Sequence, residues 1–194
     1  MSDGDLIRVT DLKQWAYCQR IVYYHRVMPG VGQPTFKMRE AVAAQDVVEG
    51  LEMRRGLQAY GLAEAERLFG LWLSSPALGL SGKTDLVLRG LDRVSVVDFK
   101  LTSGPVGENH RQQLAGYSLL AEEVFGLPAP VAFLYRIPDN RVFAVEISEE
   151  RRAAVRAAVA GIREMAEKQI LPEATEVRGR CVECEYANYC GDVW

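Results

Sequence analysis

Two aspartates and a lysine lie close together in a stretch whose hydrophobic pattern is typical of β-strands. In the segment 96–100, strand alternation places Asp98 and Lys100 on one face. A two-residue loop at 91–92 pairs residue 90 with 93, and it then sets Asp85 opposite Asp98. Opposed carboxylates repel each other unless a cation lies between them or one is protonated. The pattern predicts a site for Mg²⁺ or Mn²⁺, because these ions prefer oxygen ligands.

Such a site indicates phosphate chemistry. A metal ion on two carboxylates can bind a phosphodiester oxygen and activate a water molecule. Lys100 can position that water or neutralise the developing charge. An ordinary surface pair between Asp98 and Lys100, beside a turn aspartate, explains the same residues equally well.

A polar row on the next predicted helix supports the phosphate interpretation. Gln113 and Tyr117 are four residues apart on one face, and His110 lies one turn before Gln113. Such a row can hold a nucleic-acid backbone or a displaced base, although a solvated helix face accounts for it about as well.

Three of the four cysteines, Cys181, Cys184 and Cys190, have the spacing C-x2-C-x5-C. This spacing lets the sulfurs converge on one inorganic centre, with Cys18 as the fourth ligand, which joins the tail to the first helix. Zinc ribbons favour two C-x2-C pairs, so the uneven spacing favours a 4Fe-4S cluster over a structural zinc ion. Four unrelated buried cysteines remain the alternative without a metal. Either centre is structural, because four thiolates leave no open coordination position.

Hydrophobic spacing predicts the elements that position these residues. Thr10 and Asp11 cap a first helix that carries Cys18, and period-two alternation over 63–100 predicts an antiparallel meander. The remaining predicted elements are a long helix over 37–59, a helix over 108–125, a hairpin of 131–137 with 142–147, and a last helix from Ser148 and Glu149, followed after Pro172 by an aperiodic tail.

Length and composition set the class of protein. The 194 residues, 48% hydrophobic and 25% charged, predict a single domain over 1–194, in which 1–30 and 172–194 form the cysteine region. A net charge of −3 argues against binding nucleic acid by charge alone. The acidic start and the short apolar runs favour a cytoplasmic protein without a membrane segment.

Taken in order, these motifs resemble a known family. Gly82-Lys83-Thr84-Asp85, Asp98-Phe99-Lys100 and the segment from Gln113 to Tyr117, flanked by one early and three late cysteines, resemble the CRISPR-associated Cas-four exonucleases. These are RecB-like nucleases of the PD-(D/E)xK type with an iron–sulfur cluster. The resemblance runs from Cys18 to Cys190. It implies an α/β (α+β) fold with a restriction-endonuclease-type core, in which helices flank a central mixed sheet and a cluster joins the N-terminal helix to the tail.

The resemblance also implies roles for individual residues. Asp85 and Asp98 become ligands of Mg²⁺ or Mn²⁺, with the Phe99 carbonyl as a third, and Lys100 becomes catalytic. Gln113 and Tyr117 match the substrate-binding motif Q-x3-Y. The four 4Fe-4S ligands are then Cys18, Cys181, Cys184 and Cys190.

The family's biology implies a DNA exonuclease or endonuclease that processes prespacers with single-stranded ends during CRISPR adaptation. It helps select and orient spacers with the integrase Cas-one and with Cas-two, and some members are fused to Cas-one. One position departs from the pattern, since Gln45 stands where the family has a metal-binding histidine. A weakly active or inactive DNA-end-binding adaptor is therefore the alternative, and a zinc-stapled interaction protein without a nucleic-acid role is a third.

Overall fold

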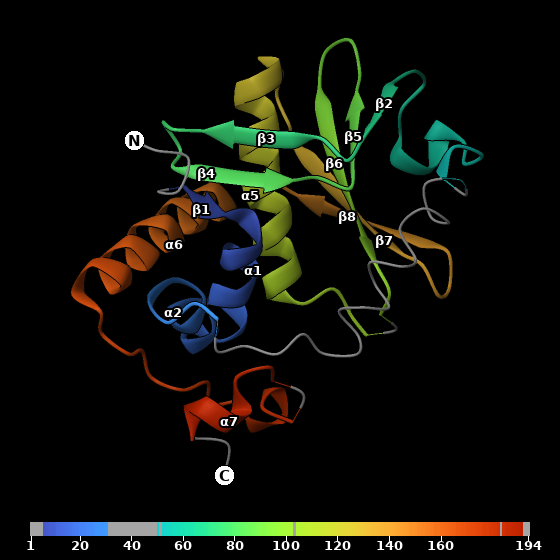
Figure 1. The fold of residues 1–194 in the computed structure, drawn as a ribbon. Coiled ribbons are helices and arrows are strands. Elements are labelled where there is room, and N and C mark those ends of the chain that lie inside the picture. The colour runs from blue at the N-terminus through green and yellow to red at the C-terminus, as the bar shows by residue number, and fades with distance from the viewer. Residues whose placement is uncertain (1–5, 31–49, 51, 103, 183, 192–194) are drawn as a thin grey trace.

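The computed structural model describes residues 6–30, 50, 52–102, 104–182 and 184–191 (Figure 1). Its main sheet has five strands in the order β2-β5-β6-β7-β8, and only the β6–β7 pair is parallel. The chain is therefore an α/β protein with a mixed sheet and flanking helices. The strands are β2 (Glu66–Phe69), β5 (Leu86–Arg89), β6 (Val94–Lys100), β7 (Val131–Arg136) and β8 (Arg141–Glu146).

A second, three-stranded sheet corrects the predicted meander over 63–100. Strands β3 (Trp72–Ser75) and β4 (Leu80–Lys83) leave the main sheet and pair with β1 (Ile7–Arg8) in the order β1-β4-β3. Gly70, with a φ of 61°, turns the chain between β2 and β3. Leu73 and Leu80 on this hairpin are buried in the main core. Period-two alternation predicts strands, but it does not say which strands share a sheet.

The β5–β6 hairpin has the predicted register. Leu86 pairs with Val97 and Arg89 with Val94. The turn is closed by a hydrogen bond from the Gly90 N–H to the Arg93 carbonyl, with an N···O distance of 2.9 Å. Continued by one residue, this register sets Asp85 opposite Asp98.

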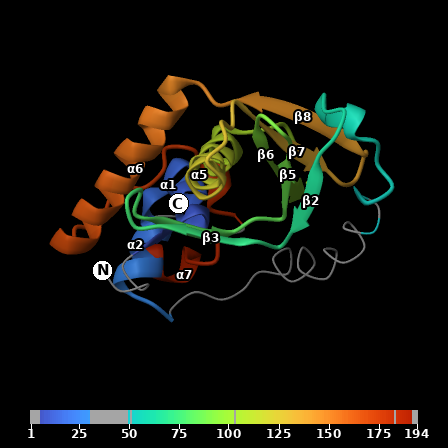
Figure 2. The same ribbon diagram turned by 90° about the horizontal axis from the view of Figure 1, so that it is seen from above.

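Helix α5 (Glu108–Phe125) has the predicted bounds and is buried from Gln112 through Ala121. Figure 2 shows it between α1 (Val9–Tyr17) and α6 (Glu149–Lys168) on one side and the main sheet on the other. The last helix begins as predicted, because the Ser148 hydroxyl accepts a hydrogen bond from the Arg151 N–H. None of the described helices is long and apolar enough to cross a membrane.

The predictions for the N-terminal helices need two corrections. The first helix begins at Val9, and Arg8 occupies its N-cap without a side-chain hydrogen bond, so Thr10 and Asp11 are not the cap. Cys18 is extended, at φ −161° and ψ 116°, and separates α1 from α2 (Gln19–Val27) instead of lying on a helix. Because Cys18 is extended, its side chain does not follow the helical spacing of the residues in α1 and α2.

The predicted helix over 37–59 lies mostly outside the described residues, as does Gln45. Its described end is wrong, because the chain leaves the helix after Glu52 and forms the 3-10 helix η2 (Leu57–Tyr60). Gly56 separates the two pieces, and Tyr60 packs in a smaller core on the other face of the main sheet. The tail, aperiodic as predicted, contains the 3-10 helix η3 (Arg178–Arg180) and the short helix α7 (Ala187–Cys190).

A fully buried carboxylate anchors η2. Glu52 is 0% exposed, and its Oε2 accepts hydrogen bonds from Arg55 Nε at 2.9 Å and from the Tyr60 hydroxyl at 2.8 Å. Arg67 of β2 lies 3.8 Å from the other carboxylate oxygen. The Arg55 guanidinium lies over the Tyr135 ring, 4.3 Å from its centroid. The carboxylate therefore joins this segment to β2 and β7.

We expect Glu52→Leu to lower the free energy of unfolding by about 3 kcal/mol, because it leaves two partly buried guanidinium groups without their counter-charge. Urea unfolding measures the loss. The control is Glu66→Leu, since the exposed Glu66–Arg89 pair contributes less than about 1 kcal/mol. Equal losses in the two variants would contradict this role for Glu52.

Candidate active site

Asp98 and Lys100 point to the same side of β6, as strand alternation predicts. Asp98 is 4% exposed, and its Oδ2 lies 2.6 Å from Lys100 Nζ. The surface-pair interpretation therefore fails for Asp98, because both its carboxylate and the partner ammonium are largely withdrawn from solvent. A buried carboxylate with an adjacent lysine is typical of catalytic and metal sites.

Asp85 completes the pair of carboxylates. It follows β4 and Thr84 along the chain, and its Oδ2 accepts a hydrogen bond from the Phe99 N–H at 2.7 Å. This bond fixes Asp85 against β6, one residue from Asp98. Phe99 thus contributes its N–H here, and the role of its carbonyl stays a prediction.

Two further side chains reach this site: Lys13, which sequence reasoning missed, and His110, which it placed in the polar row of the next helix. Lys13 of α1 is largely buried, which lowers its pKa, and the positive charge of Lys100 adds to the effect while Asp98 opposes it. His110 has its pKa lowered to about 4, first by burial and then by Lys100 and Lys13. His110 is therefore neutral at physiological pH, and its buried Nδ1 has no hydrogen-bond partner among the described residues. No local pattern identifies Lys13, because only the packing of α1 on α5 brings it here.

Gln113 and Tyr117 are both 4% exposed, so the solvated-face interpretation of their row is wrong. The Tyr117 hydroxyl donates to the Lys83 carbonyl at 2.8 Å, and burial together with Asp98 and Asp85 raises its pKa. A Cβ on Gly82 would lie 2.9 Å from the Tyr117 ring, which explains a glycine there. Tyr117 thus holds the strand end that leads to Asp85. Gln113 Oε1 is buried without a hydrogen-bond partner in the described part of the chain.

The donor set fits a divalent cation only in part. Among the described residues, no three His, Cys, Asp or Glu side chains meet the geometry for binding one metal ion. Asp85 and Asp98 supply two oxygen-ligand side chains, and Mg²⁺ commonly takes its other ligands from water and substrate phosphate. The pair thus fits an ion whose coordination shell is completed by molecules other than these side chains.

The four cysteines line one cavity, together with Tyr24 and Tyr186, and all four are free thiols. Burial raises the pKa of the Cys184 thiol. Arg20 Nη1 donates a hydrogen bond to Cys190 Sγ at 3.3 Å. The fold therefore brings Cys18 to the three tail cysteines, as the spacing predicts.

Contacts around this cavity hold the tail against α1 and α2. The Tyr24 and Tyr186 rings stack at 5.0 Å, and Arg20 Nε donates to the Pro172 carbonyl at 2.8 Å. The Arg180 guanidinium lies 4.8 Å from the Tyr17 ring centroid. His25 lies between two carboxylates, with Nδ1 3.2 Å from Asp11 and Nε2 3.7 Å from Glu185 of the tail.

We expect the contribution of His25 to stability to depend on pH. The hydrogen bond and charge of Asp11, with Glu185, raise the pKa of His25 in the folded state. Its contribution is then fully present below the unfolded value of about 6.5 and is lost as pH rises through the raised pKa. His25→Gln should therefore lower the free energy of unfolding, measured by urea denaturation, by roughly 1 kcal/mol at pH 6 and by little at pH 8.5. The other histidine, His110, titrates below this window. A loss that is equal at both pH values would contradict the assignment.

A mixed sheet that brings two carboxylates and a lysine together is typical of nucleases of the PD-(D/E)XK class, and the comparisons place the chain in this class. The PD-(D/E)XK nuclease superfamily matches residues 8–191. Two solved structures share the fold. SSO0001 matches with a TM-score of 0.53 at 20% identity, and the match covers 100% of this chain and 89% of that chain. A putative exonuclease from Eubacterium rectale matches with a TM-score of 0.58 at 10% identity, and the match covers 91% of this chain and 86% of that chain.

Sequence comparison narrows the class. The CRISPR-associated exonuclease Cas4 of Francisella tularensis subsp. novicida is 31% identical over 191 residues, which are 98% of this chain and 96% of that protein. The Cas4 exonuclease of Aeropyrum pernix is 25% identical over 190 residues, 94% of this chain and 93% of that protein. The chain belongs to the PD-(D/E)XK nucleases and, within them, to the CRISPR-associated Cas-four exonucleases.

Proposed function

We propose that this nuclease is a metal-dependent DNA exonuclease or endonuclease that trims the single-stranded ends of prespacers and helps select and orient spacers during CRISPR adaptation. The observation that carries the proposal is the pair of opposed carboxylates, Asp85 and Asp98, with Lys100 Nζ 2.6 Å from Asp98. Its relatives are CRISPR-associated exonucleases, which supports DNA as the substrate.

Each side chain then has a distinct task. Asp85 and Asp98 would hold Mg²⁺ or Mn²⁺, with the Phe99 carbonyl as a further ligand; when bound, the ion lowers the pKa of a water molecule and polarises the phosphate. Lys100 orients the attacking water and neutralises charge that develops on the phosphate oxygens. Lys13 adds a second positive charge from α1. Gln113 offers its unpartnered buried Oε1 to the substrate, and Tyr117 keeps β4 in place.

We assign Cys18, Cys181, Cys184 and Cys190 to a structural 4Fe-4S cluster. The four cysteines line one cavity, and their uneven C-x2-C-x5-C spacing favours a cluster over the two C-x2-C pairs of a zinc ribbon. The cluster would join residues 172–191 to the N-terminal helices, within a single nuclease domain over 1–194.

Cas-one and Cas-two are the proposed partners, on the strength of family membership. An adaptor that binds DNA ends without cleaving them is the second candidate, and Gln45, in the place of a histidine ligand, favours it.

Cleavage of a duplex with labelled 3′ overhangs separates the two candidates. The protein is incubated alone and with Cas-one and Cas-two, in Mn²⁺ and in EDTA. We expect shortened strands in Mn²⁺ and intact strands in EDTA. Binding of the overhang without shortening, both alone and with the partners, would establish the adaptor instead.

A further inference from the structure

One face of the three-stranded sheet is buried, and the opposite face is exposed except at Ser81, which is 4% exposed. Ile7, Leu73 and Leu80 face the core and are at most 3% exposed. By strand alternation and register, the opposite face carries Arg8 beside Ser81, Ser74 across from Ser81, and Trp72 across from Lys83. We call Arg8, Trp72, Ser74, Ser81 and Lys83 the sheet platform.

The platform presents an aromatic ring and positive charge to solvent. The Trp72 side chain is 58% exposed although it is a large hydrophobic group, and Arg8, Ser74 and Lys83 are exposed as well. Within the described part of the chain, neither Arg8 nor Lys83 forms an ion pair, so both cations are available to a ligand. Among the described residues of the three strands, none on this face is acidic.

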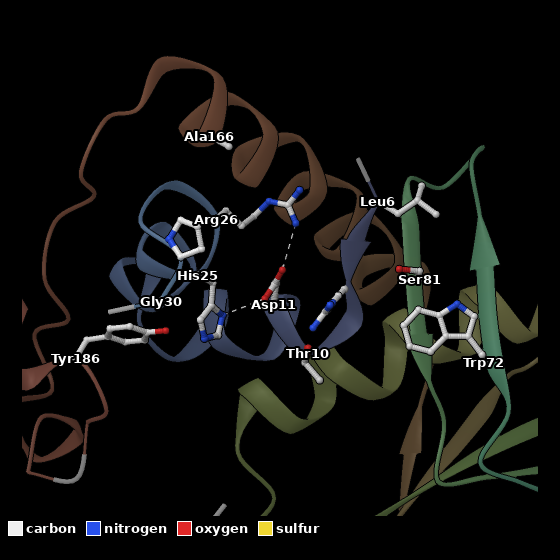
Figure 3. A pocket seen from close by; sticks show the side chains of 12 residues that line it. Leu6, Thr10, Asp11, His25, Arg26, Gly30, Trp72, Ser81, Ala166 and Tyr186 are labelled. Carbon is white, nitrogen blue, oxygen red and sulfur yellow. Dashed lines mark hydrogen bonds and ion pairs between the residues drawn. The ribbon is translucent and has the colours of Figure 1, made fainter. Parts of the chain in front are cut away.

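The platform continues into a cavity of about 610 Å³ (Figure 3). Trp72 and Ser81 lie at one end, and Asp11, His25 and Tyr186 lie toward the other. Arg8 and Arg26 both line this cavity. The Asp11 carboxylate is engaged by His25 and Arg26, and Glu185 lies 3.7 Å from His25 Nε2. The charge of Arg26 is therefore balanced by Asp11, and a polyanion would be attracted to Arg8, whose charge no described carboxylate balances.

The platform also adjoins the candidate active site along the chain. Lys83, opposite Trp72, gives its carbonyl to Tyr117, and Asp85 is two residues further on. The Thr84 N–H bonds the Leu71 carbonyl at 2.8 Å, which ties the segment before Trp72 to the segment before Asp85. A nucleic-acid strand bound to the platform would therefore lie next to the end of β4, which positions Asp85.

We propose that the sheet platform binds a single strand of DNA, with a base stacked on the Trp72 indole and with Arg8 and Lys83 contacting phosphates. Stacking on an exposed aromatic ring with flanking cations is how sequence-tolerant single-strand sites work, because every base has a π face. The inference rests on the proposed function for its ligand, and it adds a binding surface outside the carboxylate site.

The test uses the fluorescence of Trp72 as its readout. In a Trp15→Phe, Trp194→Phe background Trp72 is the only tryptophan. We expect oligo-dT to quench this fluorescence, and Trp72→Ala to weaken binding of the same labelled oligonucleotide about ten-fold by anisotropy. Arg8→Ala and Lys83→Ala should each reduce the slope of log K against log salt by about 1. Arg156→Ala, an exposed arginine on α6, is the matched control and should leave the slope unchanged.

Each outcome bears on one proposal. Oligonucleotide binding that neither quenches Trp72 nor weakens in Trp72→Ala would overturn the platform and leave the nuclease intact. Quenching that is stronger with duplex than with single strands would also overturn it. Quenching that persists in a protein without cleavage would support the platform and count against the proposed enzymatic function. Failure of any oligonucleotide to bind contradicts both.

Discussion

Asp98→Asn is expected to lower the rate of DNA cleavage at least about 100-fold while the protein stays folded. The amide keeps the shape of the side chain but removes the charge that would hold the metal ion, and a group that acts on the transition state is worth this much or more. The variant leaves Lys100 without its counter-charge but also relieves the repulsion between Asp98 and Asp85, and this offsets part of the loss of stability. Release of label from a 3′ overhang in Mn²⁺ measures the rate, and circular dichroism checks the fold.

Two variants control this result. Asp92→Asn, on the exposed β5–β6 turn, removes one negative charge from the same hairpin and should cleave at the wild-type rate. Lys100→Ala should lose activity as Asp98→Asn does, because Lys100 is proposed to orient the attacking water and to neutralise charge on the phosphate oxygens. Activity within a factor of three of wild type in Asp98→Asn would refute the assignment of the metal ligand.

Cys181→Ser is expected to release the tail and, with it, the metal centre. Anaerobically purified wild-type protein should contain about four irons per chain and absorb near ~400 nm, and the variant should lose both. We expect Tm to fall by about 5–10 °C, because metal binding that joins distant segments contributes directly to folding free energy. Trypsin should then cut after Arg178 or Arg180 in the variant and spare these bonds in the wild type.

The composition of the wild-type centre decides between its alternatives. One zinc ion and no colour would rule out the iron–sulfur assignment but keep the four-cysteine site. If the wild-type protein contains neither iron nor zinc and Cys181→Ser is as stable as the wild type, the four cysteines are only packing residues. Because the carboxylate site is separate, Cys181→Ser should keep Asp85 and Asp98 in place, so residual cleavage is compatible with loss of colour.

The sequence predicted the local parts of this architecture well. Helix α5 and the β5–β6 register follow from spacing and from a short turn, because both depend on residues close along the chain. Assignment of β3 and β4 to a second sheet could not be predicted, since alternation is the same in both sheets and the choice depends on packing against α1 and α5. The break at Cys18 was missed because one extended residue does not interrupt the apolar spacing of α1 and α2.

The same distinction holds for the site. The opposition of Asp85 and Asp98 could be derived from one hairpin, whereas Lys13 enters through tertiary packing alone. Gln113 and Tyr117 were recognised as a row, but their burial depends on how α5 sits between two layers. The substrate-binding roles of Gln113 and Tyr117 stay predictions. So do the metal-binding roles of Asp85, Asp98 and the Phe99 carbonyl and the catalytic role of Lys100.

The cysteine cavity is built from segments far apart along the chain, with Cys18 on one side and Cys181, Cys184 and Cys190 on the other, and this sets an order of events during synthesis. Everything from Asp85 to Tyr117 leaves the ribosome well before Cys181, so the nuclease site can assemble while the tail is still being made. The cluster, as proposed, can only be completed once Cys190 has been made. Protein made in a cell short of iron would then have its carboxylates in place while residues 172–191 stay unattached to the N-terminal helices, and that segment would be open to proteolysis.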